Sequence, residues 1–175
     1  MTRTLLIAAA ALTLAACATA PEPLGPPTSD VRAPVGEASQ TQWDAGNAAY
    51  LAWNAGRPGW TTTASGLQYR RVGPAMEDGR RPVATDTVRV HYRGTFIDGR
   101  EFDSSWSRGE STEFPLNRVI RGWTEGVALM REGERFEFVI PAALGYGERW
   151  VGGDDLPPNS TLLFTVDLIE VKPPA

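Results

Sequence analysis

Hydrophobic and polar residues alternate through much of the second half of the chain. Within TVRVHYRGTF, residues 87–96, the apolar side chains stand at alternate positions: Val88, Val90, Tyr92 and Phe96. A period of two predicts a strand with one buried face. The segments 135–140 (RFEFVI) and 161–171 (TLLFTVDLIEV) alternate in the same way, and 67–71 (LQYRR) adds a shorter segment. Together they predict an antiparallel sheet with one solvated face.

A turn and one helix complete this pattern. Asp98-Gly99 predicts a tight hairpin from the strand over 87–96 into REFD at 100–103. The segment 119–130 (VIRGWTEGVALM) has apolar residues at helical spacing, which predicts a short helix with Gly133 as its left-handed cap. The apolar set of this helix is Val119, Ile120, Trp123, Val127 and Met130. An antiparallel sheet covered by one short helix places the chain in the α+β class.

The residues before this region have another composition. The segment 41–55 (TQWDAGNAAYLAWNA) carries aromatic residues among alanines and predicts one short helix that ends near Gly56 and Pro58. We expect residues 41–60 to be a helical flank packed on a main domain of residues 61–175; a dimerisation arm is the alternative. Residues 18–40 contain five prolines and few large apolar groups, so residues 17–40 are expected to form a flexible tether.

The first residues resemble a processed export signal. Arg3 precedes an apolar run from Leu5 to Leu14, which is short for a membrane span. The sequence Leu-Ala-Ala-Cys at 14–17 is similar to the lipobox of bacterial lipoproteins. We therefore predict a signal peptide over 1–16 and lipid modification of Cys17; an ordinary secretory peptide is the alternative. Cys17 is the only cysteine, which excludes an intramolecular disulfide.

Composition limits the remaining possibilities. A chain of 175 residues with 42% hydrophobic content can bury one core of ordinary size. Its net charge is −4, and the arginines are scattered rather than clustered. The chain thus has no electrostatic footprint for nucleic acid.

Familiar catalytic and metal-binding arrangements are absent from the sequence. The sole histidine, His91, lies on the polar face of a predicted strand, where a surface side chain is more common than a base or a ligand. Glu148, Asp154 and Asp155 lie near one another but lack the spacing of a calcium loop. GYG at 145–147 belongs to no complete phosphate-binding motif. We expect neither a metal nor a cofactor.

Four motifs together carry a family resemblance. They are VHYRGTFIDGREFDSS, VIRGWTEGVALM, IPAALGYG and LPPNSTLLFTVDLIEV. In this order and at these separations they closely resemble the FKBP-type peptidyl-prolyl cis-trans isomerases, over about residues 61–171. NAAYLAWNA and SGLQYR are similar to the lead-in of bacterial envelope members. The resemblance implies a sheet wrapped around a short helix, with a pocket between them, and isomerase activity without a cofactor.

The resemblance also assigns the site. It implies catalytic roles for Tyr92, Phe102, Asp103, Trp123, Tyr146 and Phe164, and substrate contacts for Phe114, Val119, Ile120 and Leu156. Trp123 would be the pocket floor, although its helical spacing alone fits a core residue equally well. The Ile120 N–H and the Tyr146 hydroxyl would donate hydrogen bonds to substrate. Asp103 would orient the tyrosines, chiefly Tyr92, or act electrostatically near the rotating carbonyl; a structural hydrogen-bond acceptor is the alternative.

Two features depart from the family pattern. Thr112 stands where small eukaryotic members carry a further pocket aromatic, and the loop over 148–158 brings Trp150 and two acids near the expected rim. These differences bear on substrate range and on affinity for tacrolimus-type macrolides.

The leading hypothesis is a lipid-anchored isomerase that acts on proline-containing unfolded or exported polypeptides. The lipid on Cys17 would hold it in the bacterial envelope, facing the periplasm, and Ala18 favours the outer over the inner membrane. A non-catalytic polypeptide-binding chaperone module on the same fold is the first alternative, and a structural lipoprotein is the second.

Overall fold

The computed structural model describes residue 34, residues 37–152 and residues 156–174. The predicted signal peptide and Cys17 lie outside these residues, as do most of the predicted tether and the loop acids Asp154 and Asp155. Within the described ranges, no helix has the length and apolar character needed to cross a membrane.

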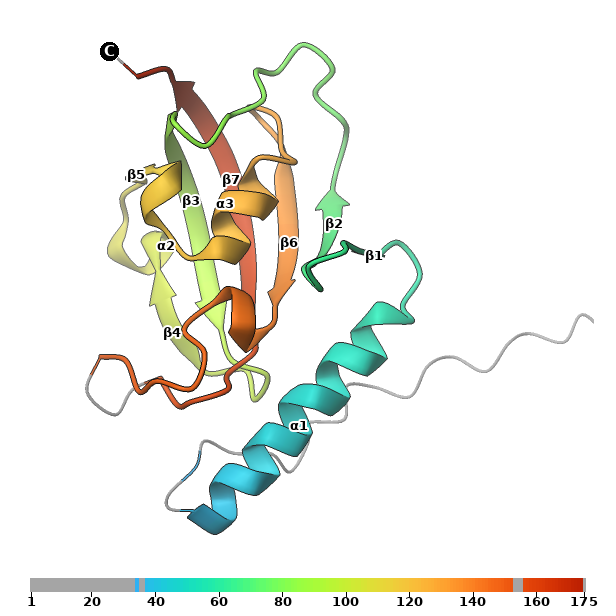
Figure 1. The fold of residues 1–175 in the computed structure, drawn as a ribbon. Helices are drawn as coiled ribbons and strands as arrows, with labels where there is room; N and C mark the ends of the chain where they lie inside the picture. Colours follow the sequence, from blue (N-terminus) through green and yellow to red (C-terminus); the bar gives the residue numbers. More distant parts are fainter. Residues whose placement is uncertain (1–33, 35–36, 153–155, 175) are drawn as a thin grey trace, which may run out of the picture.

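The strands of the described chain form one antiparallel sheet, which confirms the predicted class. Their bounds are β1 Thr61–Thr62, β2 Gln68–Val72, β3 Thr87–Thr95, β4 Glu101–Ser104, β5 Thr112–Pro115, β6 Arg135–Ile140 and β7 Leu162–Lys172. The order across the sheet is β1-β2-β6-β7-β3-β4, and β5 also pairs with β3. Alternate residues of β3 are buried, as its sequence predicts. The buried face lies beneath the helix α3, Arg121–Val127 (Figure 1).

Helix α3 is shorter than the helix predicted over 119–130. Val119 and Ile120 precede it, with Ile120 at the N-cap, and Met130 follows it as a fully buried residue. Gly133 has a positive φ of 87°, as expected, but it precedes β6 and caps no helix, because the C-cap of α3 is Ala128. Side chains predicted to share one helix face therefore come from the helix and from the segments on either side of it.

Two glycines let α3 lie directly on the sheet. A Cβ on Gly122 would stand 2.5 Å from Cγ2 of Ile140, and one on Gly126 would stand 2.7 Å from Cε1 of Phe138. Glycine costs roughly 1 kcal/mol relative to alanine inside a helix. Packing on β6 offsets this cost, and the close approach places Trp123, between the two glycines, deep in the domain.

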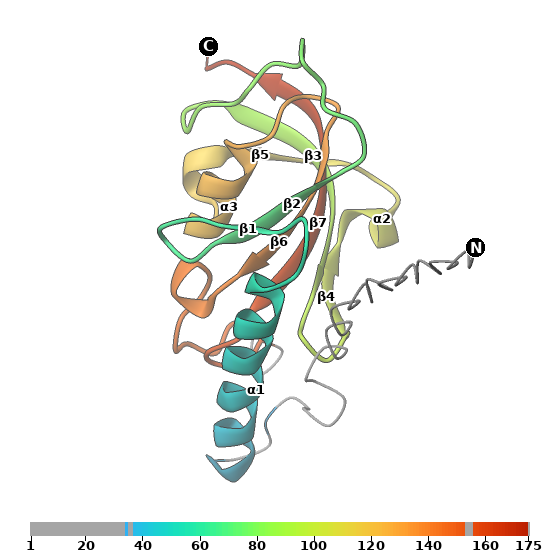
Figure 2. The same cartoon turned by 90° about the vertical axis from the view of Figure 1, so that its right-hand side faces the viewer.

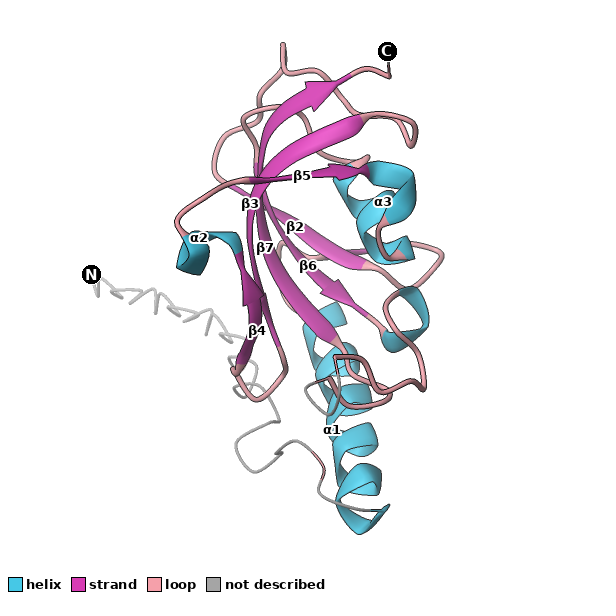
Figure 3. Cartoon of the chain, turned by 90° about the vertical axis from the view of Figure 1, so that its left-hand side faces the viewer, coloured by secondary structure: helices cyan, strands magenta, loops and turns pink. Residues whose placement is uncertain are grey.

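The edge of β3 is shared by two short strands. β5 pairs with Thr87–Val90 and β4 with Arg93–Thr95, so residues 91–92 pair with neither. The helix α2, Ser105–Arg108, lies beside this gap (Figure 3). There the Ser105 hydroxyl accepts from the Tyr92 N–H at 2.8 Å and contacts the Tyr92 carbonyl at 3.3 Å. One buried hydroxyl thus replaces a strand partner where the Tyr92 side chain enters the core.

Helix α1, Glu37–Ala55, packs across the end of the sheet where β3 and β6 end and β2 and β7 begin (Figures 1 and 2). Trp43 is fully buried, meets Phe96 edge-to-face at 5.9 Å and donates to the Ser160 hydroxyl. The helix begins at Glu37, inside the segment predicted as tether. Gln40 explains this difference, because its amide donates to the distant Pro158 carbonyl at 3.1 Å and so docks the first turn.

Candidate active site

Trp123 is the centre of an aromatic cage under α3. Only 4% of its surface is exposed, and three rings meet it edge-on. Tyr92 from β3 and Phe164 from β7 each lie 5.3 Å from it between ring centroids, and Phe114 from β5 lies at 5.6 Å. Edge-to-face pairs at this separation are favourable beyond the area that they bury. The cage therefore holds the indole in one orientation.

Trp123 is also part of a pocket wall. A pocket of about 660 Å³ opens above it, between α3 and the sheet. Phe102 from β4 joins this wall and meets Phe164 edge-on at 5.5 Å. The lining residues are Tyr92, Phe102, Asp103, Phe114, Arg118, Val119, Ile120, Arg121, Trp123, Gly145, Tyr146, Arg149 and Phe164. Trp123 thus lines a pocket and is also a member of the core.

Nine of the ten pocket residues assigned from the resemblance line this pocket. Leu156 is the exception. It is 8% exposed and belongs to the hydrophobic core. Its N–H and carbonyl pair with Val151 in an isolated bridge. The structure therefore does not place Leu156 among the residues that line the pocket, and its assignment to the substrate contacts stays a prediction.

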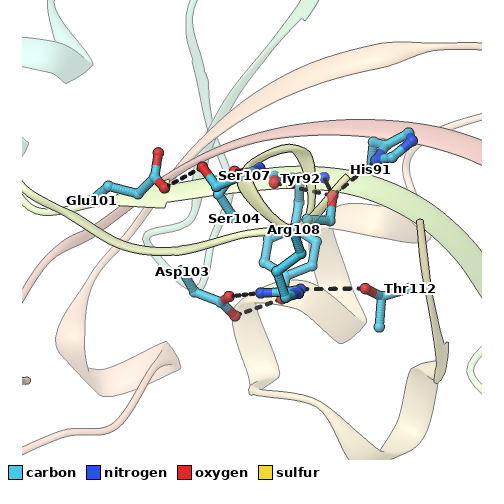
Figure 4. A network of polar contacts seen from close by, with 9 residues as sticks. His91, Tyr92, Glu101, Asp103, Ser104, Ser107, Arg108 and Thr112 are labelled. Atoms are coloured by element: carbon cyan, nitrogen blue, oxygen red, sulfur yellow. Dashed lines mark hydrogen bonds and ion pairs between the residues drawn. The ribbon is translucent and has the colours of Figure 1, made fainter. Parts of the chain in front are cut away.

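A polar network fixes the tyrosine and the acid at one side of the pocket (Figure 4). The Tyr92 hydroxyl donates to Oδ2 of Asp103 at 2.5 Å. Arg108, from α2, forms an ion pair with Asp103 and donates to the Tyr92 hydroxyl oxygen at 2.9 Å. Burial raises the pKa of Tyr92, and the hydrogen bond to Asp103 raises it further. The phenol therefore stays protonated, and its hydrogen bond to Asp103 fits both the orienting role and the alternative of a structural acceptor.

Three donors of lining residues have no hydrogen-bond partner among the described residues: the Tyr146 hydroxyl, the Ile120 N–H and the buried indole N–H of Trp123. Burial raises the pKa of Tyr146, and the nearby negative charge of Asp103 adds to the effect. No contact within the described residues therefore competes with a ligand carbonyl for the Tyr146 hydroxyl or the Ile120 N–H.

His91 takes no part in the pocket. Its Nδ1 lies 3.0 Å from the Ser105 hydroxyl, and its ring stacks on Trp106 at 5.7 Å. It belongs to the opposite face of β3 from Tyr92, as the alternation predicts.

Sequence reasoning missed the arginines of the site. Arg108 follows Asp103 by five positions, and only the turn of α2 brings the two together. Arg118, Arg121 and Arg149 line the pocket mouth from three separate segments. The available signal was weak: Arg121 lies in the motif VIRGWTEGVALM, Arg118 directly precedes that motif, and Arg149 follows GYG closely.

The lining residues limit the chemistry of this site. Among the residues that the structure describes, the lining includes no serine, cysteine, histidine or lysine, and its one carboxylate, that of Asp103, is held by Tyr92 and Arg108. A nucleophile needs a neighbouring base, and these side chains offer no such pair. What the arrangement can do is enclose an apolar group, exclude water and donate hydrogen bonds to carbonyl oxygens.

Comparisons with known proteins agree with this description. The family described as FKBP-type peptidyl-prolyl cis-trans isomerase matches residues 78–169, more than half of the chain. The FKBP-type peptidyl-prolyl cis-trans isomerase FkpA of Aeromonas hydrophila is 51% identical over 126 residues, which are 72% of this chain and 46% of that protein. Outer membrane protein MIP of Legionella longbeachae is 44% identical over 124 residues, 71% of this chain and 52% of that protein.

A solved structure extends the likeness to the fold. The crystal structure of FkpA from Escherichia coli superposes with a TM-score of 0.68 at 43% identity, covering 78% of this chain and 64% of that one. The chain spans about half the length of the curated relatives that it matches.

Proposed function

Because the chain belongs to the FKBP-type peptidyl-prolyl cis-trans isomerase family, we propose that it accelerates rotation about X-Pro peptide bonds. The observation that carries the proposal is the apolar pocket floored by Trp123 and walled by Phe102 and Phe164, with two unused donors at its side. Such a pocket suits a proline ring flanked by peptide carbonyls.

The reaction needs no reactive side chain. Rotation about a peptide bond faces a barrier of roughly 18–20 kcal/mol, because the planar amide must lose its resonance. For X-Pro bonds it takes tens to hundreds of seconds unaided. The planar amide is the more polar form, so transfer out of water disfavours it relative to the twisted state. A pocket that also fits the twisted geometry binds the transition state more tightly than the ground state.

Each residue of the pocket then has a role. Trp123, Phe102 and Phe164 form the dry surface against the ring, with Phe114, Val119 and Ile120 beside them. The Ile120 N–H and the Tyr146 hydroxyl hold the flanking carbonyls of the substrate. Asp103 and Arg108 fix the position of Tyr92. None of these steps moves a proton to or from the amide.

The pH dependence of activity follows from Tyr146. Its hydroxyl donates only when protonated, and its pKa is raised above the ordinary value of about 10. The ratio of kcat/KM between the parent protein and Tyr146→Phe is therefore expected to stay constant from about pH 7 to pH 9. A protease-free peptide assay measures this ratio. A ratio that collapses toward one below pH 9 would show that the hydroxyl ionises early and would contradict the assignment.

Two assays distinguish the isomerase from a chaperone on the same fold. The first follows refolding of a protein whose slow phase is X-Pro isomerisation, and the second follows suppression of aggregation. The proposal expects the slow phase to speed up with catalytic amounts of the protein. Suppressed aggregation with an unchanged slow phase would support the chaperone instead, and no effect in either assay would support a structural lipoprotein.

We further propose that the substrates are exported polypeptides in the bacterial envelope. Support comes from the name of the Legionella longbeachae relative, outer membrane protein MIP. The signal-like residues 1–16 and the lipobox-like sequence before Cys17 point the same way. The protein would then face the periplasm, and Ala18 supports the outer rather than the inner membrane.

Lipid anchoring predicts a clear change on substitution of Cys17. The Cys17→Ser variant loses the thiol that would carry the lipid, so it is expected to move from the membrane fraction to the soluble fraction. Immunoblotting of the two fractions measures this change, and Ser29→Ala, a hydroxyl loss within the predicted tether, is the control. A Cys17→Ser variant that stays with the membranes would argue against the anchor.

We also propose that tacrolimus-type macrolides bind this pocket, as the family resemblance implies. Such a ligand would occupy the place of the proline ring above Trp123. It would therefore inhibit isomerisation competitively, which a rate measurement at several peptide concentrations tests.

A further inference from the structure

Three arginines surround the mouth of the pocket. Arg118 ends the 3-10 helix η1 (Leu116–Arg118), Arg121 begins α3, and Arg149 lies in the loop after the 3-10 helix η2 (Ala142–Leu144). All three are exposed, and all three line the same pocket as Trp123. We call them the arginine rim.

No carboxylate of the described residues forms an ion pair with the arginine rim. Arg121 donates to the Ala143 carbonyl, and Arg149 contacts the Tyr146 carbonyl at 3.4 Å, so these contacts leave both charges uncompensated. The pocket's own acid, Asp103, is already neutralised by Arg108. Among the described residues, the pocket lining therefore carries three arginine charges that no carboxylate pairs with, although the whole chain has a net charge of −4.

A positive mouth has a direct consequence for the substrate. The proline ring enters toward the Trp123 floor, so the side chains of neighbouring substrate residues stay near the rim. A carboxylate there gains from three nearby guanidinium groups, whereas an ammonium is repelled. From this placement, and resting on the isomerase function proposed above, we infer that the site prefers X-Pro segments that carry Glu or Asp beside the proline.

Because the three arginines of the rim are exposed, we expect only a moderate preference for acidic substrates. Exposed ion pairs are individually weak and are screened by salt. With three arginines acting together, kcat/KM for a Glu-Pro peptide is expected to exceed that for the matching Lys-Pro peptide by about three- to tenfold at low ionic strength. A Gln-Pro peptide lies between them. Raising the salt to about 0.5 M brings the ratio toward one, because the Debye length falls to a few ångströms.

Variants of the full chain test the source of the preference. In Arg118→Gln/Arg149→Gln, the Glu-Pro to Lys-Pro ratio is expected to fall to about twofold or less. Using the ratio within one variant cancels any change in general activity. The control is Arg89→Gln, which removes the same kind of charge from an arginine outside the pocket lining that pairs with Glu170 at 2.9 Å. This control is expected to keep the parent ratio.

The outcomes separate this inference from the proposed function. A parent protein that accelerates Leu-Pro, Glu-Pro and Lys-Pro peptides equally would overturn the preference and leave the isomerase intact. A preference that persists in the double variant would overturn the role of the arginine rim. Failure to accelerate even the Leu-Pro peptide would instead overturn the proposed function, and the inference with it.

Discussion

Truncation of Trp123 to alanine is expected to lower kcat/KM for a Leu-Pro peptide by about thirtyfold. Loss of a central, buried aromatic contact in a binding site typically costs at least about 2 kcal/mol, and each 1.36 kcal/mol is a factor of ten. Trp123 is such a residue, because it contacts Tyr92, Phe114 and Phe164 and floors the pocket. Without the indole, water reaches the amide and the twisted state loses its apolar partner.

The same substitution affects the fold, so activity and stability must be measured together. Truncation of a buried Trp costs about 3–5 kcal/mol of unfolding free energy. Urea unfolding of the variant defines conditions under which it is still folded, and the rate is compared there. Trp106→Ala is the matched control, since Trp106 is 37% exposed and stacks on His91 outside the pocket. Full activity in folded Trp123→Ala would contradict the role of the floor.

Substitution of Gly94 by alanine is expected to reduce both stability and activity, although it leaves every pocket side chain chemically unchanged. A Cβ on Gly94 would lie 2.5 Å from Cζ of Phe102 and 2.8 Å from Cε1 of Phe164. Both rings would have to move, and overpacking of this kind costs about 1–3 kcal/mol. Because the two rings form the pocket wall, we expect kcat/KM to fall by about tenfold, in line with that cost. Urea unfolding and the peptide assay measure the two effects.

Gly56→Ala provides the matched control for this prediction. A Cβ on Gly56 would meet only the Trp53 carbonyl oxygen, at an ordinary 3.6 Å. The control should change stability little and activity not at all. If Gly94→Ala behaves in the same way, the two rings are not held where the structure places them.

The sheet was predictable because burial of one face of a strand requires an apolar residue at every second position of its sequence. Val88, Val90 and Tyr92 on β3 show this directly, since the same alternation that marks the strand also turns them inward. The ends of the helices were less predictable. The length of α3 depends on Gly122 and Gly126 meeting Ile140 and Phe138, contacts that no local pattern contains.

The start of α1 depends on a contact just as remote. Gln40 docks on Pro158, which lies far along the chain, and the local composition indicated only a tether. Local periodicity therefore identified the elements, while long-range packing set their limits.

The site was predictable mainly through the family resemblance. Periodicity alone left Trp123 as core or pocket, and the structure shows it as both. Leu156 lies in the core outside the pocket lining, and its backbone pairs with Val151, a contact that its place in the motif did not indicate. Arg108 was missed because its pairing with Asp103 requires the turn of α2. The contacts of long charged side chains near a pocket are hard to predict from sequence, because these side chains contact residues on several strands and helices.

The central claim is that an apolar pocket around Trp123 accelerates X-Pro rotation without a reactive side chain. Magnetisation-exchange NMR on a Leu-Pro peptide measures that rotation directly, with no coupled enzyme. Unaided exchange takes tens to hundreds of seconds, and the account predicts that its rate rises in proportion to added protein at sub-stoichiometric amounts. An exchange rate that stays the same at every concentration of folded protein would contradict it.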